Sequence, residues 1–400
     1  MAYKDYTKKT HQSVLHLKKD VVEKKYIQKK DHKNRFSSVK NEMYCLNKFS
    51  HKNVYAPEII KYDDISYTMK RYDFSLGNSK AISGNHVRRL LFTCSFKEVS
   101  DQLDEIQNIL KKRKIIHKDI NPGNFLFCEK EKRLKLVDFY WASTDNINVD
   151  FIKGVNGIYG KDSEAFAKIK KQISGINKKV KEQVEKSKIE ILSKLGKVYY
   201  DGSAKHKGKT YHPIDIPYYK GNLYHKKINY EFNNIIKNIN QPVESVIDIG
   251  CAAGYYLFNL ARKYQMKKVI GYEADPVMRS FLKTVKNIFY LNEFIFNKGI
   301  DESTNFKDVD LVICMNVHMW LEKQLGKKVD LVISNLINHS KQMFFQTAGA
   351  ESAGKYLVKW LKSKEDIQEY LERLGGKKVT FIDTSKRGGL RYLFKIGDIE

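Results

Sequence analysis

The sequence predicts an α+β domain followed by a doubly wound α/β domain, with a helical segment between them. Three observations predict this fold class. Strand-like and helix-like stretches surround a polar turn at residues 117–124. Residues 161–197 carry apolar side chains every three or four positions, which is helical spacing. From residue 243 onward, buried strands alternate with helices, as in parallel sheets covered on both faces. The predicted boundaries are residues 1–160, 161–205 and 206–400.

The first domain is predicted from short segments whose periodicity changes in turn. Residues 14–30 alternate apolar and polar side chains as strands do, and residues 35–49 follow helical spacing. Residues 54–72 indicate two short strands, and residues 86–113 indicate a helix that leads into the polar turn. Two further strands, FLF and LKLVDF, flank the charged turn CEKEKR. Separate helices among such strands are typical of an α+β domain.

Composition places the chain among globular proteins. With 400 residues, 42% of them hydrophobic, it is long enough for two or three cores. No apolar run approaches the roughly 18–20 residues that cross a bilayer, and the start, MAYKDYTKKTHQ, lacks the apolar core of a signal peptide. The five cysteines are scattered, which indicates reduced thiols and neither a zinc site nor a disulfide framework. We expect a cytoplasmic protein, with peripheral contact at the inner membrane face left open.

The formal net charge of +27 indicates a polyanionic partner, such as nucleic acid, anionic lipid or a phosphorylated glycan. However, only 11 of the 73 basic residues are arginines, the residue that favours bidentate contacts to phosphates and base edges. The lysines are spread along the whole chain. This pattern favours a solvated, lysine-rich surface over a dedicated nucleic-acid site, and it leaves nucleic acid open as a partner.

The segment 161–197 is predicted to form one amphipathic helix or a short coiled coil. Three arrangements fit it: packing between the two domains, pairing with a second subunit in a homo-oligomer, or covering the first domain. The apolar positions are Phe166, Ile169, Ile173, Ile176, Val180 and Val184.

The polar turn carries residue types that phosphoryl transfer requires. Asp119 can orient or deprotonate an acceptor hydroxyl, and Asn124 and Asp138 offer the oxygen ligands that magnesium prefers. His117 is placed to brace the turn. The spacing HxDxxxxN, followed by DF after two strands, brings these residues to one region of the chain.

Upstream, Lys24 in the strand VVEKKY is predicted to grip phosphate oxygens, and Glu42 in the following helix is predicted to pair with it. Lys25 is the alternative if the strand has the opposite register. With these residues, the chain from 14 to 145 resembles the protein-kinase-like superfamily, and the resemblance implies ATP and magnesium as ligands.

The departures from that family are specific. Asn121 stands where protein kinases usually have a lysine, Tyr140 is the third residue of the DFG-like triplet, and no glycine precedes Lys24. There is also no APE-like segment. These differences favour the small-molecule and glycan kinase branches. The missing glycine-rich loop leaves open a non-catalytic kinase-like scaffold.

The second motif is DIGCAAG at residues 248–254, between a buried strand and a helix. Gly250 and Gly254 allow a tight turn and close approach of a ligand, and Glu273 ends the next strand, where it can accept hydrogen bonds from ribose hydroxyls. The pattern begins with Asp248 and reads DxGxxxG, unlike the GxGxxG of dinucleotide folds. It resembles class I S-adenosylmethionine-dependent methyltransferases, which implies S-adenosylmethionine as cofactor.

Residues on the acceptor side are predicted less directly. Asn316 and His318 follow the fourth strand, with His318 as a candidate base and packing as its alternative role. Arg391 can meet an acceptor phosphate or form a surface ion pair. The segment 209–232 is predicted to form a lid over the pocket, or else to pack on the sheet as a surface extension. Its candidate lid residues are Tyr211, His212, Tyr219, Lys220, His225 and Lys226.

The combination of both motifs resembles the bifunctional kinase–methyltransferases that terminate bacterial O-antigen chains, although those enzymes place the methyltransferase first. The resemblance implies that a terminal sugar is phosphorylated and that the phosphate is then methylated, in lipopolysaccharide biosynthesis, with a glycan or glycolipid as acceptor. Two rival hypotheses remain. One is an RNA methyltransferase whose kinase-like domain binds substrate, and the other is a pseudokinase scaffold.

Overall fold

The structure is a computed structural model, and it describes residues 6–9, 13–26, 38–63, 66–145, 161–199, 213–221, 225–348, 363–386 and 390–397. The chain divides into two compact units, Met1–Lys181 and Glu182–Glu400, called unit 1 and unit 2 here. The division falls inside one helix, α4 (Asp162–Tyr199), in the middle of the predicted helical segment. Each unit is described by itself.

Unit 1 begins with an antiparallel sheet in the order β1-β2-β3-β5-β4. Its strands are β1 (Tyr6–Lys9), β2 (Ser13–Leu17), β3 (Val21–Tyr26), β4 (Ile59–Tyr62) and β5 (Ser66–Lys70). One helix, α1 (Ser38–Ser50), falls between the third and fourth strands in sequence. This confirms the strands and the helix predicted for residues 14–72, within the described part of that range.

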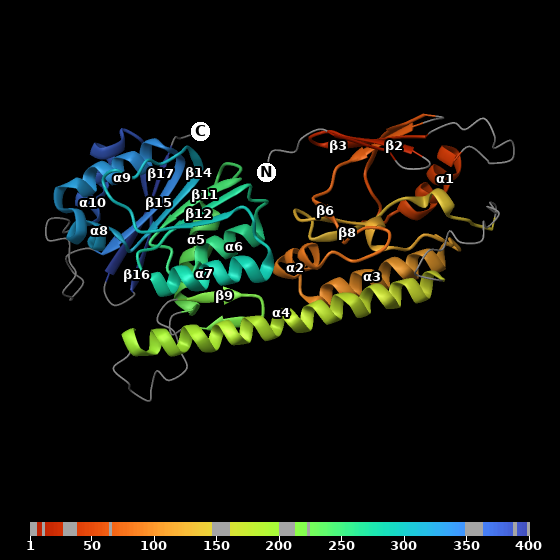
Figure 1. The fold of residues 1–400 in the computed structure, drawn as a ribbon. Helices are drawn as coiled ribbons and strands as arrows, with labels where there is room; N and C mark the ends of the chain where they lie inside the picture. The colour runs from red at the N-terminus through yellow and green to blue at the C-terminus, as the bar shows by residue number, and fades with distance from the viewer. Residues whose placement is uncertain are drawn as a thin grey trace. The chain divides into compact units, whose positions relative to one another are not determined.

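The rest of unit 1 is a small antiparallel sheet, β6-β7-β8, with helices beside it (Figure 1). The elements are β6 (Phe74–Ser75), α2 (Gly84–Thr93), α3 (Phe96–Lys112), η1 (Pro122–Asn124), β7 (Phe125–Cys128), β8 (Arg133–Leu136) and η2 (Phe139–Trp141). Residues 86–113 are helical, as predicted, and form two helices because Ser95 caps a new one. Its hydroxyl accepts from the Glu98 amide at 3.2 Å, and the Glu98 carboxylate accepts from the Ser95 amide at 2.6 Å.

Helix α4 confirms the predicted amphipathic helix, and its apolar stripe is covered within the single chain. In unit 1, Phe166 packs edge-on against Phe125 at 5.6 Å, and Lys170 forms an ion pair with Asp104 of α3. Most of the described stripe is thus buried within this chain, with Ile176 half-buried, and the first half of the helix covers unit 1.

Unit 2 is built on a seven-stranded sheet in the order β13-β12-β11-β14-β15-β17-β16. The first five strands run parallel, and β17 inserts antiparallel between β15 and β16. This confirms the doubly wound sheet and its predicted antiparallel finish. The strands are β11 (Ser245–Ile249), β12 (Lys268–Tyr272), β13 (Phe294–Asn297), β14 (Val309–Met315), β15 (Ser340–Ala348), β16 (Val379–Lys386) and β17 (Leu390–Gly397).

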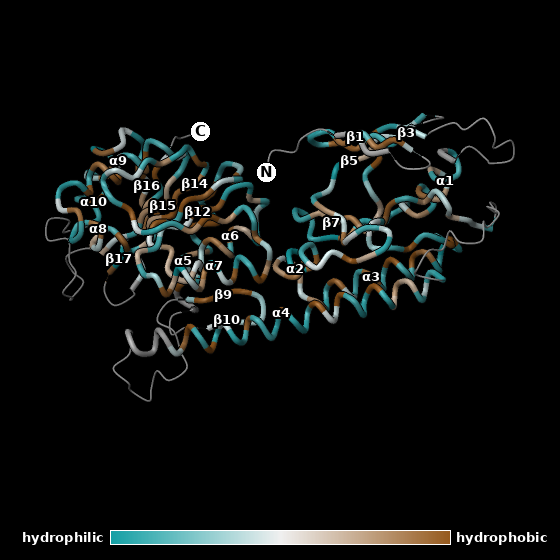
Figure 2. The backbone as a smooth tube through the Cα atoms, viewed as in Figure 1, coloured by the Kyte–Doolittle hydropathy of each residue, from teal (hydrophilic) through white to brown (hydrophobic). Residues whose placement is uncertain are grey.

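Helices cover both faces of this sheet (Figure 1), and apolar residues are concentrated along its strands (Figure 2). The remaining elements of unit 2 are β9 (Ile214–Ile216), β10 (Tyr219–Gly221), α5 (His225–Lys237), α6 (Tyr255–Lys263), α7 (Pro276–Phe289), α8 (His318–Leu325), η5 (Gly326–Lys328), α9 (Val329–Asn338) and α10 (Lys364–Gly375). The chain turns from β11 to β12 on one side and places β14 on the other. Ligands of such sheets bind at this switch point, outside the carboxyl ends of the strands.

Two further properties hold for the described residues. None of their helices combines the length and the apolar character needed to cross a membrane. The five cysteines are buried free thiols.

Candidate functional sites

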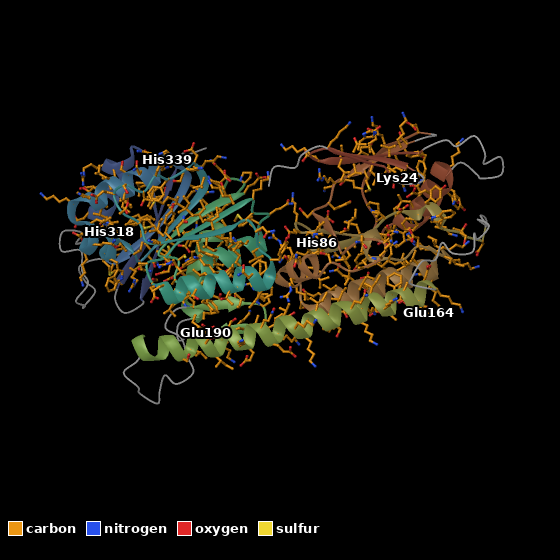
Figure 3. All side chains as sticks on the ribbon, in the orientation of Figure 1. Lys24, His86, Glu164, Glu190, His318 and His339 are labelled. Atoms are coloured by element: carbon orange, nitrogen blue, oxygen red, sulfur yellow. The ribbon has the colours of Figure 1, made fainter. Side chains whose placement is uncertain are left out.

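Lys24 is the centre of a buried charge cluster in unit 1. Its Nζ lies 3.0 Å from Oε2 of Glu42 on α1 and 2.8 Å from Oδ1 of Asp138 after β8. Lys25, the alternative register, is exposed, because adjacent side chains of a strand point to opposite faces. The structure therefore brings together Lys24, Glu42 and Asp138 as the sequence predicted (Figure 3 labels Lys24 on β3).

Lys24 and Asp138 keep their charges, whereas burial raises the pKa of Glu42 to about 7, although Lys24 opposes the shift. Burial alone would lower the pKa of Lys24, but Asp138 and Glu42 outweigh it and hold that pKa well above its usual range. Burial likewise acts to raise the pKa of Asp138, and Lys24 more than offsets it, so the pKa lies below its usual value. When a phosphate binds, the Lys24 ammonium can replace its contact to one carboxylate by a contact to phosphate oxygens, which accept the same hydrogen bonds.

Asp119 is held by two side-chain amides. Asn121 donates to its Oδ1 at 2.9 Å, and Asn124 donates to its Oδ2 at 3.0 Å. Burial raises the pKa of Asp119, and the nearby Asp138 adds to this. Since Asn124 uses its Nδ2 on Asp119, its carbonyl oxygen remains for another partner, as a magnesium ligand would require.

The turn around these residues is fixed by Asn121 and His117. Asn121 accepts a hydrogen bond from the Gly123 amide at 2.9 Å, so the residue that replaces the usual lysine caps the turn. His117 is fully buried, and its Nε2 donates to the Val137 carbonyl at 3.2 Å. Its predicted bracing role is consistent with these contacts.

Aromatic rings surround Lys24, a feature that sequence reasoning missed. Tyr26 and Tyr140 stack with centroids 5.7 Å apart, and the Lys24 ammonium lies 5.1 Å and 5.9 Å from the two centroids. Tyr67 donates to Glu42 at 3.1 Å. Tyr26 could have been identified, because it lies two residues after Lys24 and shares its face of the strand.

In unit 2, the glycine turn follows β11 at the switch point of the sheet. Gly250 and Gly254 have φ values of +66° and +78°, in the left-handed region. A Cβ at Gly254 would lie 2.6 Å from Phe258 and 2.7 Å from Leu282. Both the backbone conformation and the close packing therefore require glycine at this position.

A cavity of about 780 Å³ opens at this turn. One side is formed by the turn and the ends of the neighbouring strands, including Asp248, Gly250, Glu273, Ala274, Gly299 and Ile300. Asn316 directly follows β14 and belongs with these strand ends. The remainder of the wall includes Tyr256, Trp320, Lys323, Gln324 and Arg391, from α6, α8 and β17. The cavity volume suits a cofactor-sized ligand.

The carboxylates of the first side fit S-adenosylmethionine. Glu273 accepts from the Ala252 amide at 2.7 Å and from the Asp275 amide at 2.9 Å, which fixes its carboxylate at the end of β12. Each oxygen retains a lone pair for a ribose hydroxyl. Asp248 is buried, and its Oδ2 has no partner among the described residues, so a cationic amino group of the ligand would satisfy it. Burial, and then Glu273, raise the pKa of Asp248 well above its usual range in the ligand-free protein.

Asn316 lies in the cavity wall with φ of +60°. Its amide group donates to the Gln346 side chain, and its Oδ1 has no partner among the described residues. The predicted placement of Asn316 at the ligand site is therefore consistent with the structure.

His318 is placed away from the cavity, and this argues against the predicted role as a base. Its side chain is fully buried, and its Nε2 lies 3.2 Å from the Tyr370 hydroxyl (Figure 3 labels His318). Burial lowers the pKa of His318 to about 4, although Asp330 opposes the shift. The residue begins α8 and points into the core, which strand position alone did not reveal.

The predicted lid segment contributes to the cavity through other residues than those expected. Pro213 and Ile228 line it, whereas Tyr219 is buried in the hairpin β9–β10 and Lys220 lies 3.7 Å from Asp215. Tyr211 and His212 lie outside the described residues, as do the side chains of His225 and Lys226. Arg391 does line the cavity, because β17 starts at the carboxyl edge of the parallel strands.

Comparisons with known proteins agree with this geometry for unit 2. A protein-family model described as a methyltransferase domain matches residues 247–336. An uncharacterized protein of Rickettsia prowazekii (strain Madrid E) is 26% identical over 101 residues, which are 24% of this chain and 40% of that protein.

Among solved structures, the bifunctional kinase–methyltransferase WbdD is 15% identical, with a TM-score of 0.39, and the match covers 52% of this chain and 46% of WbdD. The magnesium protoporphyrin IX methyltransferase of Synechocystis PCC 6803, solved with bound SAH, is 18% identical, with a TM-score of 0.34. That match covers 44% of this chain and 83% of the methyltransferase. This chain thus spans less than half the length of the curated relative and of WbdD. The family model, the strand order and the glycine turn support a class I methyltransferase domain in unit 2, with S-adenosylmethionine as its cofactor.

Proposed function

We propose that this chain phosphorylates a hydroxyl group in unit 1 and methylates the resulting phosphate in unit 2. The observation that carries the proposal is the composition of the methyl-transfer cavity. Its described lining contains no histidine. The carboxylates Asp248, Glu273 and Asp275 lie at the strand ends where the cofactor would bind, and the cations Lys323 and Arg391 line the wall from α8 and β17. A hydroxyl acceptor needs a base, whereas a phosphate monoester already carries nearly two negative charges at pH 7. The cavity therefore suits an acceptor that arrives deprotonated and anionic.

Unit 1 has the groups to make that acceptor. Asp119 would take the proton of the hydroxyl as its oxygen bonds to the γ-phosphorus of ATP, and the bond to the departing ADP breaks. Lys24 would contact the phosphate oxygens. Asn124 and Asp138 would hold magnesium, which supplies charge neutralisation at the triphosphate when bound. Support comes from the ion pairs of Lys24 at 3.0 and 2.8 Å and from the fixed carboxylate of Asp119.

In unit 2, Asp248, Gly250, Gly254, Glu273 and Asn316 would hold S-adenosylmethionine, which supplies a methyl group on a sulfonium. A phosphate oxygen would take this methyl as the carbon–sulfur bond breaks, and no proton needs to be removed. Burial of the charged reactants in the cavity would strengthen their alignment.

The acceptor that we propose is the sugar end of a glycan or glycolipid precursor, in surface polysaccharide synthesis at the inner membrane face. The many lysines would favour contact with anionic lipid there.

The test is a double-label transfer assay on fractionated cell extract. Methyl label from S-adenosylmethionine and phosphoryl label from the γ-phosphate of ATP are followed into RNA, protein and lipid-linked glycan. The proposal expects both labels in the glycan fraction, with methyl label dependent on ATP and lost in Asp119→Asn. The control Asp101→Asn changes an exposed carboxylate of α3 and should behave as the wild type.

Other outcomes would replace the proposal by a specific rival. The +27 net charge favours RNA as the second candidate acceptor. Methyl label in RNA that is indifferent to ATP would establish that activity and make unit 1 a binding module. Methyl label in glycan without any ATP dependence would indicate a pseudokinase unit that does not prepare the acceptor.

A further inference from the structure

A buried carboxylate outside the sequence motifs connects the two sides of the methyl-transfer cavity. Glu231, on α5, is 2% exposed and does not line the cavity. Its Oε2 accepts a hydrogen bond from the Tyr256 hydroxyl at 3.3 Å, and its Oε1 accepts from the Ser385 hydroxyl at 2.9 Å. Tyr256 lines the cavity from α6. One branch of hydrogen bonds from Glu231 therefore ends at a residue of the cavity wall.

The second branch ends at the cofactor side. Gln346, which is 1% exposed, donates from Nε2 to the Ser385 hydroxyl at 3.4 Å and accepts from the Asn316 side-chain amide. The structure thus contains a continuous chain from Glu231 through Ser385 and Gln346 to Asn316 in the cavity wall.

The direction of every bond in this chain follows from the carboxylate. A carboxylate only accepts, so the Ser385 hydroxyl donates to Glu231 and offers a lone pair to Gln346. The Gln346 amide then turns its nitrogen toward Ser385 and its oxygen toward Asn316. Asn316 must point its nitrogen at Gln346, which leaves its Oδ1 as an acceptor without a partner among the described residues. The orientation of Asn316 is set by a residue three hydrogen bonds away.

Helix α5 is positioned by two contacts of the same kind. Asn234 donates to Asp383 at 2.7 Å, one helical turn after the contact between Glu231 and Ser385. Residues three apart on a helix share a side, and residues two apart on a strand share a face. Phe232 also packs against Tyr256 at 6.3 Å. The helix is thereby fixed on both β16 and the beginning of α6.

We infer that Glu231 is a positioning residue for methyl transfer, which orients Tyr256 toward the acceptor through one branch and Asn316 toward S-adenosylmethionine through the other. The inference rests on the methyl-transfer part of the proposed function, and on neither phosphoryl transfer nor the identity of the acceptor. It predicts that the two branches affect different steps, because they end on different sides of the cavity.

Two single-atom deletions separate the branches. Ser385→Ala removes the link to Asn316, so binding of S-adenosylhomocysteine, measured by calorimetry, should weaken about fivefold, the effect of about one hydrogen bond. Methyl transfer into whole cell extract at saturating S-adenosylmethionine should stay close to the wild-type rate. Tyr256→Phe should leave S-adenosylhomocysteine affinity unchanged and lower transfer about tenfold, since an orienting contact to the acceptor is lost.

Glu231→Gln should lower both S-adenosylhomocysteine affinity and methyl transfer. The glutamine amide must donate to the hydroxyl of Tyr256 or Ser385, which reverses the direction of the hydrogen bonds in that branch. The matched control is Tyr230→Phe, which removes a hydroxyl from the exposed neighbour on α5 and should change neither measurement. Equal effects of Ser385→Ala and Tyr256→Phe on both measurements, or no effect of either, would overturn the inference.

The outcomes also separate this inference from the proposed function. If the wild type transfers no methyl label to any fraction, the proposed acceptor chemistry fails. The affinity measurements then still decide about the Asn316 branch, and unchanged S-adenosylhomocysteine affinity in both Ser385→Ala and Glu231→Gln refutes it. If the methyl label is found in RNA, the proposed glycan acceptor is wrong. Ser385→Ala and Tyr256→Phe can then be compared in the same way, with transfer measured into RNA.

Discussion

Unit 1 assembles its site from charged side chains, whereas unit 2 forms its site largely from the backbone. Lys24, Glu42 and Asp138 come from three segments, the first and last of them 114 residues apart, and ion pairs hold them together. The turn from Gly250 to Gly254 is local, and its shape is fixed by left-handed backbone conformations. The site of unit 1 therefore depends on the balance of side-chain charges. The site of unit 2 depends on the backbone conformation of its glycine turn and on the space left by the missing side chains. Substitutions and pH should therefore affect the two units differently.

The largest effect is expected from Lys24→Met. Its removal leaves two carboxylates without their cation, one of them in a fully buried side chain, and breaking such a pair costs about 3–5 kcal/mol. Amide hydrogen exchange should show loss of protection in β3 and α1, and phosphoryl transfer should disappear. Lys25→Met, on the exposed face of the same strand, is the control and should be neutral. Comparable loss in both variants would show that the charge cluster is not what stabilises unit 1.

Gly254→Ala tests the backbone-built site. An alanine there has an unfavourable φ, about 1–2 kcal/mol, and its Cβ would overlap Phe258 and Leu282, which costs about 1–3 kcal/mol more. We expect unit 2 to lose stability by about 2–5 kcal/mol and S-adenosylhomocysteine to bind at least tenfold more weakly. Gly376→Ala is the matched control, since Gly376 also has a positive φ but nothing within 4 Å of its Cβ. Full affinity in Gly254→Ala would contradict the explanation.

Acid should remove the contribution of His318 to the stability of unit 2, while the raised pKa of Asp248 acts in the opposite direction. The pKa of His318 is lowered to about 4 by burial, whereas unfolded histidine titrates near 6.5. The unfolded state therefore takes up the proton first, and stability present above pH 6.5 is lost as the pH falls toward 4, by about 3 kcal/mol. In unit 1, the pKa of Asp138 is lowered from its usual value. The stability that the ionised Asp138 gives to unit 1 is therefore lost only below about pH 4, where unfolded aspartate takes up a proton.

The measurement is urea unfolding between pH 7 and pH 4, followed separately for the two units by hydrogen exchange. In His318→Gln, the pH dependence of unit 2 in this range should flatten, because glutamine can keep a hydrogen bond to Tyr370 without titrating. A slope that persists in the variant would assign the effect to another group.

The smallest effect is expected from Tyr26→Phe. The sign of its change in unfolding free energy should differ from that of Tyr67→Phe, although both tyrosines lie beside Lys24. The hydroxyl of Tyr26 is buried without a partner among the described residues, so its removal should be neutral or stabilise unit 1 by less than about 1 kcal/mol. Tyr67→Phe removes a hydroxyl that donates to Glu42 and should destabilise by about 1 kcal/mol. Thermal unfolding compares the pair, and a destabilised Tyr26→Phe would reveal a role for its hydroxyl.

Local patterns in the sequence determined much of this protein. Asp248, Gly250 and Glu273 could be placed because they lie at or directly after the carboxyl ends of strands, which meet at one edge of a parallel sheet. The spacing from Asp119 to Asn124 closes one short turn, so their contact was also predictable. In both cases the chemistry lies within a few residues or at the end of an adjacent strand, where chain geometry leaves little choice.

Tertiary structure decided the rest. The sequence left Lys24 and Lys25 as alternatives. Alternating side chains show that the two lysines lie on opposite faces of the strand, but only the packing of the sheet decides which face is buried. His318 follows a strand at the cavity edge, but the start of α8 points it into the core. The link from Glu231 to Ser385 joins residues 154 positions apart, and it exists only because β17 and β16 complete the sheet beside α5. Contacts between distant segments depend on how whole elements pack, and no local periodicity records that.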